Sequence, residues 1–137
     1  VVSAAHAHGA RVIVNASANI ACSAGADGVH LTAARLMATT MRPYCDWCGA
    51  SCHDAIELER ARKLNLDFVV LGPVAATPTH PDAKLLGWDS FAQLICDYPM
   101  PVYALGGLRV AELDQAWRSG GHGVAMLRDA WTSAQYR

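Results

Sequence analysis

The sequence has little charge of either sign and no long apolar run. Of its 137 residues, 17% are charged, and 11 Lys and Arg stand against 12 Asp and Glu, which gives a formal charge of −1. This balance offers no basic surface to nucleic acid or to an anionic membrane. An uninterrupted apolar stretch of about 18 residues is also missing, which excludes a transmembrane helix. The first residues lack the basic region and apolar core of a signal peptide.

Disorder is excluded by what the chain does contain, because 53% of its residues are hydrophobic. An apolar chain of this length buries the core of one domain. We therefore expect residues 1–137 to form a single compact domain in the cytoplasm.

The sequence has an odd number of cysteines, and their spacing shows no regular disulfide pattern. In so hydrophobic a chain, we interpret these residues as reduced thiols packed as small apolar groups. The spacing from Cys45 through Cys48 to Cys52 resembles a zinc site, but structural zinc commonly takes two ligand pairs from separate turns. An apolar, strand-like stretch joins Cys48 to Cys52 instead, so no metal ligand is predicted. The five cysteines are Cys22, Cys45, Cys48, Cys52 and Cys96.

One pattern recurs along the chain: a helix-like run ends at Gly or Asn, and a short apolar strand follows within a few residues. Strands that are apolar on both faces and alternate with amphipathic helices are typical of buried parallel sheets. The clearest helix is predicted over residues 54–64, with Asp54 as its N-cap. We predict an α/β fold with six strands, over residues 12–14, 29–31, 47–51, 68–71, 102–105 and 124–127.

Six strand–helix units fit either a doubly wound sheet or part of a (β/α)₈ barrel, which has eight strands. The chain begins in a helix-like run over residues 4–8, with no strand before it. That beginning favours an incomplete TIM (β/α)₈ barrel. Such a sheet has open edges at its first and last strands, and we expect copies of the chain to pair through them.

In parallel β/α folds, functional side chains gather at the carboxyl ends of the strands. Thr77 and Thr79 flank a proline there, in a stiff loop whose hydroxyls suit phosphate oxygens; an ordinary surface loop is the alternative. Gly106 and Gly107 end one strand, and Met126 ends the next. Barrels commonly bind phosphate through backbone amides of the loops after their last two strands.

Two histidines lie near strand ends or within a strand. His30 falls inside a strand, where we predict a hydrogen-bonded core residue. His53 stands two residues after Ser51 and is a candidate for proton transfer, although it is equally placed to cap the following helix.

Five collinear segments resemble the thiamine phosphate synthase family, from residue 9 to residue 131. The family resemblance implies a (β/α)₈ barrel of which this chain supplies roughly strands 3 to 8. The segments are residues 25–31, 49–53, 71–88 with Thr77-Pro78-Thr79, 102–107 and 123–126.

The resemblance also implies an activity. Synthases of this family join a pyrimidine pyrophosphate to a thiazole phosphate and release pyrophosphate, with Mg²⁺ and polar donors neutralising the leaving group. The implied catalytic residues are Ser51 and His53. The implied pyrophosphate ligands are Asn15, Thr77, Thr79 and His80, and the thiazole phosphate would be held by Gly106, Gly107, Met126 and Leu127.

The sequence departs from the family at the residues that bind Mg²⁺. An Asp is expected after Asn15, where Ala16 stands, and a carboxylate is expected after Thr32, where Ala33 and Ala34 stand. His80 replaces a loop lysine. Both metal carboxylates are therefore missing, and no metal-binding residue is predicted.

These departures leave two alternatives beside the synthase. One is a thiazole tautomerase, which moves a proton on the thiazole phosphate without Mg²⁺ and would use His53 as its acid–base group. The other is a non-catalytic module that binds a small phosphorylated ligand. Similar degenerate barrels are fused to Nudix hydrolase domains, so an upstream Nudix domain is an expected partner.

Overall fold

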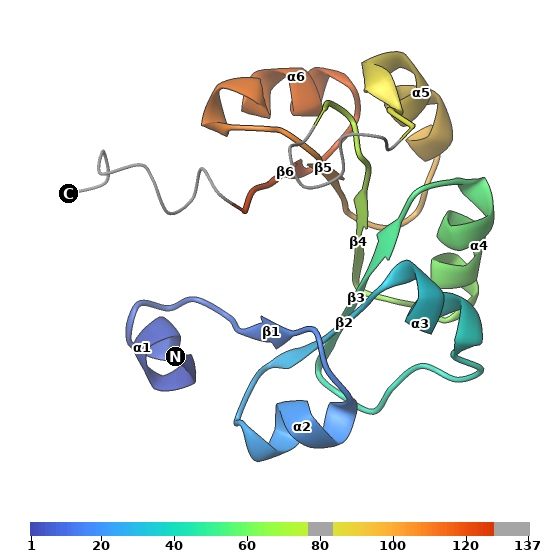
Figure 1. Cartoon of the computed structure of the whole chain (residues 1–137). Helices are drawn as coiled ribbons and strands as arrows, with labels where there is room; N and C mark the ends of the chain where they lie inside the picture. Colours follow the sequence, from blue (N-terminus) through green and yellow to red (C-terminus); the bar gives the residue numbers. More distant parts are fainter. Residues whose placement is uncertain (77–83, 128–137) are drawn as a thin grey trace.

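The strands of the computed structural model form one parallel sheet in chain order (Figure 1). The structure describes residues 1–76 and 84–127. Within that part of the chain, every neighbouring pair of strands is parallel. The predicted α/β fold is confirmed, and the sheet curves as half of a barrel. Its strands are β1 (Ile13–Val14), β2 (Gly28–Leu31), β3 (Trp47–Cys52), β4 (Phe68–Leu71), β5 (Val102–Leu105) and β6 (Gly123–Ala125).

Short helices connect the strands and cover the outer face of the sheet (Figure 1). Asp54 is the N-cap of α4, as predicted, and its Oδ1 accepts from the amide of Glu57 at 2.9 Å. Residues 110–112 form a 3₁₀ turn, η1 (Val110–Glu112), ahead of the last helix. The helices are α1 (Val2–Ala7), α2 (Ala18–Ser23), α3 (Ala33–Ala38), α4 (Ala55–Lys63), α5 (Gly87–Ile95) and α6 (Leu113–Arg118).

The core lies between the sheet and these helices. In β2, β3, β4 and β5, alternate residues point outward, and their apolar side chains are covered by the helices because burial of apolar area drives this packing. Phe91 of α5 and Leu36 of α3 are completely buried against the strands. The outward residues of the sheet that are buried are Val29, Leu31, Cys48, Ala50, Cys52, Val69, Leu71, Val102 and Ala104.

The other set of alternate residues faces the inside of the half-barrel. The strand register aligns Ser51 with Val70 and Val70 with Tyr103 in one row. Phe68 lies across Gly49, since a Cβ at Gly49 would be only 2.2 Å from the ring. The inward side chains are half-buried, because six strands do not close a barrel around them.

The amino ends of the strands are held by two carboxylates. Asp27 accepts from the amide of Val12 at 2.6 Å and lies 2.8 Å from the ring of His6. Both contacts lower the pKa of Asp27, with the amide of Val12 as the larger cause. Asp67 accepts from the amide of Cys48 at 2.6 Å. These bonds fix the loops at the end of the sheet opposite its carboxyl edge.

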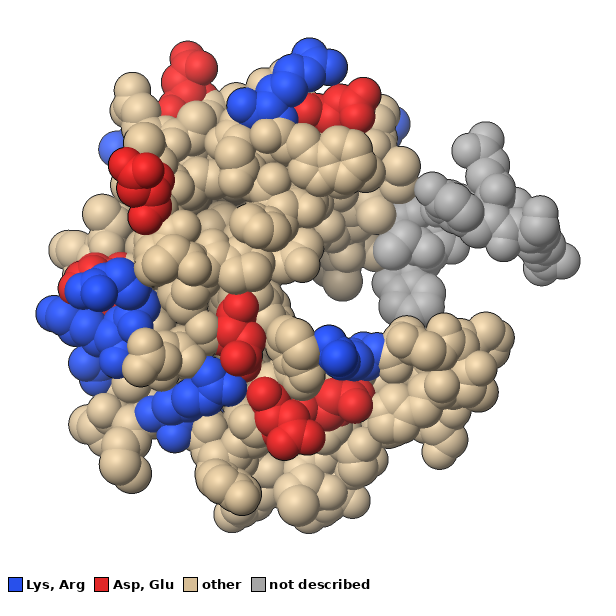
Figure 2. Space-filling model, turned by 180° about the vertical axis from the view of Figure 1, so that it is seen from behind, with Lys and Arg blue, Asp and Glu red and all other residues tan. Residues whose placement is uncertain are grey.

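The surface agrees with the charge balance of the sequence. On the face shown in Figure 2, Lys and Arg lie beside Asp and Glu instead of forming one basic area. Of the helices in the described ranges, none is long and apolar enough to cross a membrane.

The cysteines are unpaired, as predicted, but the prediction that they pack as small apolar groups is wrong for Cys22 and Cys96, which are exposed. This difference in burial makes a labelling test possible. Burial is the largest cause that raises the pKa of Cys48 and of Cys52 to about 12, whereas Cys22 and Cys96 are exposed. At pH 8 a thiol with such a pKa is ionised in only about one molecule in ten thousand.

We predict that a thiol reagent at pH 8 modifies Cys22 and Cys96 rapidly in the folded protein and leaves Cys48 and Cys52 unmodified. Mass spectrometry of the labelled peptides measures this. The protein unfolded in urea is the control, in which all cysteines react. Modification of Cys48 at the rate of Cys96 in folded protein would contradict the packing described here.

Candidate functional site

The carboxyl ends of the parallel strands meet at one edge of the half-barrel, and most predicted site residues lie along it. Asn15 follows β1 and is exposed. Ser51 lies near the end of β3. Gly106 follows β5, and Met126 follows β6. The sheet therefore gathers at one edge residues that are far apart in the sequence.

The turn after β5 is built from two glycines in the left-handed region of backbone conformation. Gly106 has φ +111° and Gly107 has φ +61°. A Cβ at Gly107 would lie 2.1 Å from the carbonyl oxygen of Ala76, and one at Gly106 would lie 2.7 Å from Pro73. Only glycine permits this close approach of the two loops.

Hydrogen bonds join the loop after β4 to the same turn. The amide of Val74 donates to the carbonyl of Leu105 at 2.7 Å, and the amide of Ala75 donates to that of Gly106 at 3.2 Å. Residue pairing places Leu105 of β5 beside Ala125 of β6. The Gly106–Gly107 turn and the Met126–Leu127 segment therefore leave adjacent strands together, as the sequence predicted.

The backbone of this pair of loops is the predicted phosphate-binding group. Gly107 and Leu127 are exposed, and the chain has no side chain at Gly107 to shield the amides. Backbone N–H groups in successive turn residues form anion-binding concavities, because their dipoles point at one place. Binding of the thiazole phosphate by Gly106, Gly107, Met126 and Leu127 stays a prediction.

A histidine that the sequence placed in the core contacts the predicted Ser51. His30 Nε2 lies 2.8 Å from Ser51 Oγ, and both side chains face the inside of the half-barrel. The predicted hydrogen bond of His30 is confirmed, but the prediction that it lies in the core is wrong, because the side chain is only partly buried on the inner face of the sheet. Its place beside Ser51 was missed, although the alternation of β2, with Val29 and Leu31 outward, is the signal that turns His30 inward.

Aromatic rings continue this inner surface beyond the pair. The rings of His30 and Phe68 have centroids 6.0 Å apart, and Phe68 meets Tyr103 edge-on at 6.1 Å. Burial lowers the pKa of His30, so the ring is neutral at pH 7 and offers one donor and one acceptor. The inner surface therefore carries one hydrogen-bonded polar pair beside two aromatic rings.

His53 lies apart from the pair, at the start of α4. Its Nδ1 is 2.9 Å from Glu57 Oε2, and its own amide donates to the same oxygen at 2.6 Å. Its ring is half exposed at 51%. Both contacts support the helix-capping alternative, and a proton-transfer role for His53 stays a prediction.

Three of the predicted pyrophosphate ligands, Thr77, Thr79 and His80, lie outside the described residues. Ala76, on one described flank of their loop, lies against the Gly107 turn, and on the other flank the amide of Leu86 donates to the carbonyl of Pro73 at 2.8 Å. Their role in binding pyrophosphate stays a prediction.

The donor set near Asn15 does not fit the Mg²⁺ that the family resemblance implies. Mg²⁺ in proteins takes carboxylate and other oxygen ligands. Ala16 follows Asn15, and Ala33 and Ala34 follow Thr32 at the end of β2, so neither loop supplies a carboxylate. Across the described ranges, no three His, Cys, Asp or Glu residues lie together as a metal site would require.

A sequence model of the thiamine monophosphate synthase family matches residues 1–130. The chain belongs to this family. The thiamine-phosphate synthase of Thermosynechococcus vestitus is 34% identical over 130 residues, which cover 93% of this chain and 37% of that protein. A putative thiamine-phosphate synthase of Geobacter sulfurreducens is 35% identical over 123 residues, covering 87% of this chain and 58% of that protein. The chain therefore spans less than two thirds of either relative.

A solved structure shares the fold. Thiamine phosphate pyrophosphorylase from Pyrococcus furiosus superposes with a TM-score of 0.72 over 90% of this chain and 60% of that chain, at 22% identity. The half-barrel therefore has the fold of part of that structure.

The buried His30 makes folding depend on pH. Because its pKa is lowered in the folded state, the unfolded chain binds that proton more readily, and the free energy of unfolding falls as the pH drops below about 6.5. At pH 5.5 this loss is at most about 1.4 kcal/mol.

We predict that His30→Gln reduces the fall in unfolding free energy between pH 7 and pH 5.5, measured by urea denaturation at each pH. His8→Gln, which changes an exposed ring, is the matched control and keeps the wild-type dependence. Identical pH dependence in His30→Gln and wild type would show that His30 is not desolvated.

Proposed function

We propose that this chain forms the carboxyl part of a thiamine phosphate synthase barrel. The protein would join a pyrimidine pyrophosphate to a thiazole phosphate. The observation that carries the proposal is the glycine turn at the end of β5, next to the end of β6, where Gly107 has φ +61° and touches the loop after β4. We call this turn, together with Met126 and Leu127, the phosphate cradle. Identities of 34% and 35% to the two bacterial relatives support it.

The reaction exchanges one bond at the pyrimidine methylene carbon. The carbon–oxygen bond breaks, pyrophosphate leaves with the electron pair, and the lone pair of the thiazole nitrogen forms the new carbon–nitrogen bond. The chain's task is to hold both reactants in line and to stabilise charge on the leaving group. The amides of Gly106, Gly107, Met126 and Leu127 would hold the thiazole phosphate.

The inner surface would receive the pyrimidine. The hydrogen bond between His30 and Ser51 leaves polar atoms of the pair for ring nitrogens, and the neighbouring Phe68 gives an apolar contact. Thr77, Thr79 and His80 are proposed as pyrophosphate ligands, with Asn15 at the end of β1. No step of this proposal uses Mg²⁺, because the described donors do not fit it.

Isomerisation of the thiazole phosphate is the second candidate, and the lack of a fitting metal site among the described residues favours it. Proton transfer between ring positions needs one acid–base group near the ring and no leaving group. His53 is the proposed group, and its exposed ring beside Glu57 can exchange a proton with solvent. Conversion of one thiazole isomer to the other, without pyrimidine pyrophosphate, would identify this reaction.

Three further proposals concern an attached domain, the pairing of copies and the cellular location of the protein. A Nudix hydrolase domain in the same protein is supported only by the family resemblance. Pairing of copies is supported by β1 and β6, which have no second strand neighbour in the described ranges and so expose backbone groups. A cytoplasmic location is supported by the unpaired cysteines.

Replacing Gly107 tests the phosphate cradle. We predict that Gly107→Ala lowers synthesis of thiamine phosphate at least about tenfold, mainly by raising KM for the thiazole phosphate, because the added Cβ displaces the loop of Ala76. Synthesis by the full-length protein is measured by oxidising the product to its fluorescent derivative.

Gly25→Ala is the matched control. Gly25 has φ +65°, and a Cβ added there would meet no atom within 4 Å, so this variant carries the same backbone strain away from the cradle. Equal loss in both variants would assign the effect to stability and contradict the cradle. Binding of thiamine phosphate without synthesis in wild type would replace the synthase with the non-catalytic alternative.

A further inference from the structure

Two cysteines lie together where the chain enters β3. Cys45 precedes the strand, and Cys48 is its second residue. The chain bends at residues 44–46, and the thiol of Cys45 donates to the carbonyl of Trp47 at 3.2 Å. That carbonyl belongs to the peptide that joins Trp47 to Cys48. A fully extended chain would separate residues 45 and 48 by about 10 Å, so the bend brings the two side chains toward each other.

The two thiol groups are in contact. Burial is the largest cause that raises the pKa of Cys48 to about 12, and Cys45 raises it further through electrostatic repulsion and a side-chain hydrogen bond. Cys52, on the same strand, is as deeply buried as Cys48. After burial, however, the causes that raise the pKa of Cys52 are the charges of Glu57 and Asp54. Cys48 is therefore a buried thiol with a second cysteine beside it.

Solvent reaches the two sulfur atoms unequally. Cys45 is half-buried and lies between the exposed Tyr44 and Asp46, whereas Cys48 is completely buried. A reagent from solvent can therefore meet Cys45 but not Cys48. Thiol–disulfide exchange passes through a mixed disulfide, which an accessible thiol forms and an adjacent thiol resolves. The pair offers one thiol for each step.

A cation lies near both sulfur atoms. The hydrogen bond to Asp67 is the largest cause that raises the pKa of Arg42, and electrostatic contacts with Cys48 and Cys45 raise it further. The guanidinium is held in place, because its Nη2 lies 2.6 Å from Asp67 Oδ2, which also accepts from the amide of Cys48 at 2.6 Å. A positive charge beside sulfur stabilises the negative charge that exchange places there.

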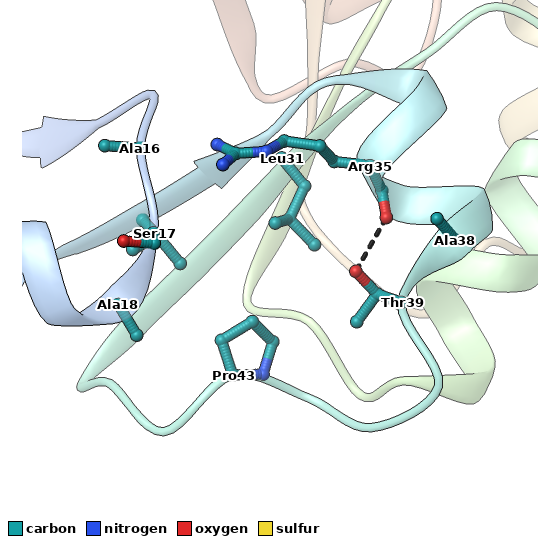
Figure 3. A pocket seen from close by; sticks show the side chains of 9 residues that line it. Ala16, Ser17, Ala18, Leu31, Arg35, Ala38, Thr39 and Pro43 are labelled. Atoms are coloured by element: carbon teal, nitrogen blue, oxygen red, sulfur yellow. Dashed lines mark hydrogen bonds between the residues drawn. The ribbon is translucent and has the colours of Figure 1, made fainter.

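The loop that carries Cys45 has open space on one side. Thr39 and Pro43, on this loop, line a cavity of about 300 Å³ that Ala18 of α2 also borders (Figure 3). The sulfur of Cys45 is 3.6 Å from the carbonyl oxygen of Pro43. A disulfide requires the two sulfur atoms to come within bonding distance. The cavity gives the loop room for that movement, while β3 is held in the sheet by β2 and β4.

We propose that Cys45 and Cys48 form a reversible disulfide by exchange with small-molecule disulfides. Cys45 gives its proton to solvent, and its thiolate attacks one sulfur of the reagent. The bond between the two reagent sulfurs breaks, and the first small thiolate leaves and is protonated. Cys48 then attacks the sulfur of Cys45, and the second small thiolate leaves with the electron pair and takes up the Cys48 proton. Two protein thiols are oxidised, and one small disulfide is reduced to two thiols.

This dithiol lies at the amino edge of the sheet, at the start of β3. The proposed substrate site lies along the carboxyl edge, so the disulfide does not rest on the proposed synthase activity. Loss of synthesis in Gly107→Ala and oxidation of the dithiol are therefore independent results.

Equilibration of the full-length protein with mixtures of oxidised and reduced glutathione tests the proposal. After acid quenching and alkylation, fragmentation of the peptides by mass spectrometry locates each disulfide. In oxidising mixtures Cys45 and Cys48 lose their alkyl groups together and the peptide is lighter by two hydrogens. Excess reduced glutathione restores both thiols, and Cys52 stays a thiol throughout.

Two variants separate the steps. Cys48→Ala accumulates glutathione on Cys45, because the mixed disulfide has no adjacent thiol to resolve it. Cys45→Ser forms neither a disulfide nor a mixed disulfide at Cys48. Because Cys45 is only half-buried, this variant keeps a melting temperature close to wild type and so preserves the test if Cys48→Ala does not fold.

Cys22→Ser is the matched control. Cys22 is an exposed cysteine on α2, and its loss leaves the disulfide between Cys45 and Cys48 unchanged. Three results would overturn the proposal. They are Cys45 and Cys48 that stay thiols while Cys22 carries glutathione, a mixed disulfide that persists on Cys45 in the wild type, and a disulfide between the pair that forms only in urea.

Discussion

Parallel pairing of the strands in chain order is the constraint on which the site depends. Each strand runs from a turn at the amino edge to a loop at the carboxyl edge, and each neighbour repeats that direction. The residues that follow the strands therefore collect at one edge, however far apart they stand in the sequence. The carboxylates of Asp27 and Asp67 bind backbone amides at the opposite edge and so hold the register that makes this possible.

Because side chains alternate along each strand, those that stabilise the fold face outward and those available to a substrate face inward. Outward residues such as Val69 and Leu71 are buried beneath the helices and supply the hydrophobic free energy of folding. Inward residues, His30 and Ser51 among them, are only half covered. Glycines permit the close contacts, because Phe68 crosses Gly49 and the Gly107 turn touches Ala76. The proposed substrate ring and phosphate would thus lie against side chains and loops that are not part of the core.

Much of this arrangement could be predicted from the sequence, because strand positions and their carboxyl ends follow from local patterns. The six strands, the Asp54 cap and the pairing of the glycine turn with Met126 depend on apolar runs and turn residues that a sequence displays. The contact between His30 and Ser51 could not be predicted in the same way, since it depends on the register of β2 against β3.

Two roles for His53, proton transfer and helix capping, are compatible with the sequence. Its hydrogen bonds to Glu57 form at the start of α4, and the position of that helix start was predicted from the sequence. The residues from Thr77 to His80 lie outside the described ranges, so their part in the site still rests on the sequence.

An amide NMR titration of the full-length protein with thiazole phosphate tests the central claim most directly, because it reports which backbone N–H groups meet the phosphate. We predict that the amide signals of Gly106, Gly107, Met126 and Leu127 shift together and saturate at one concentration of ligand. Saturable shifts confined to other parts of the chain, or none at these four residues, would contradict a phosphate cradle at the ends of β5 and β6.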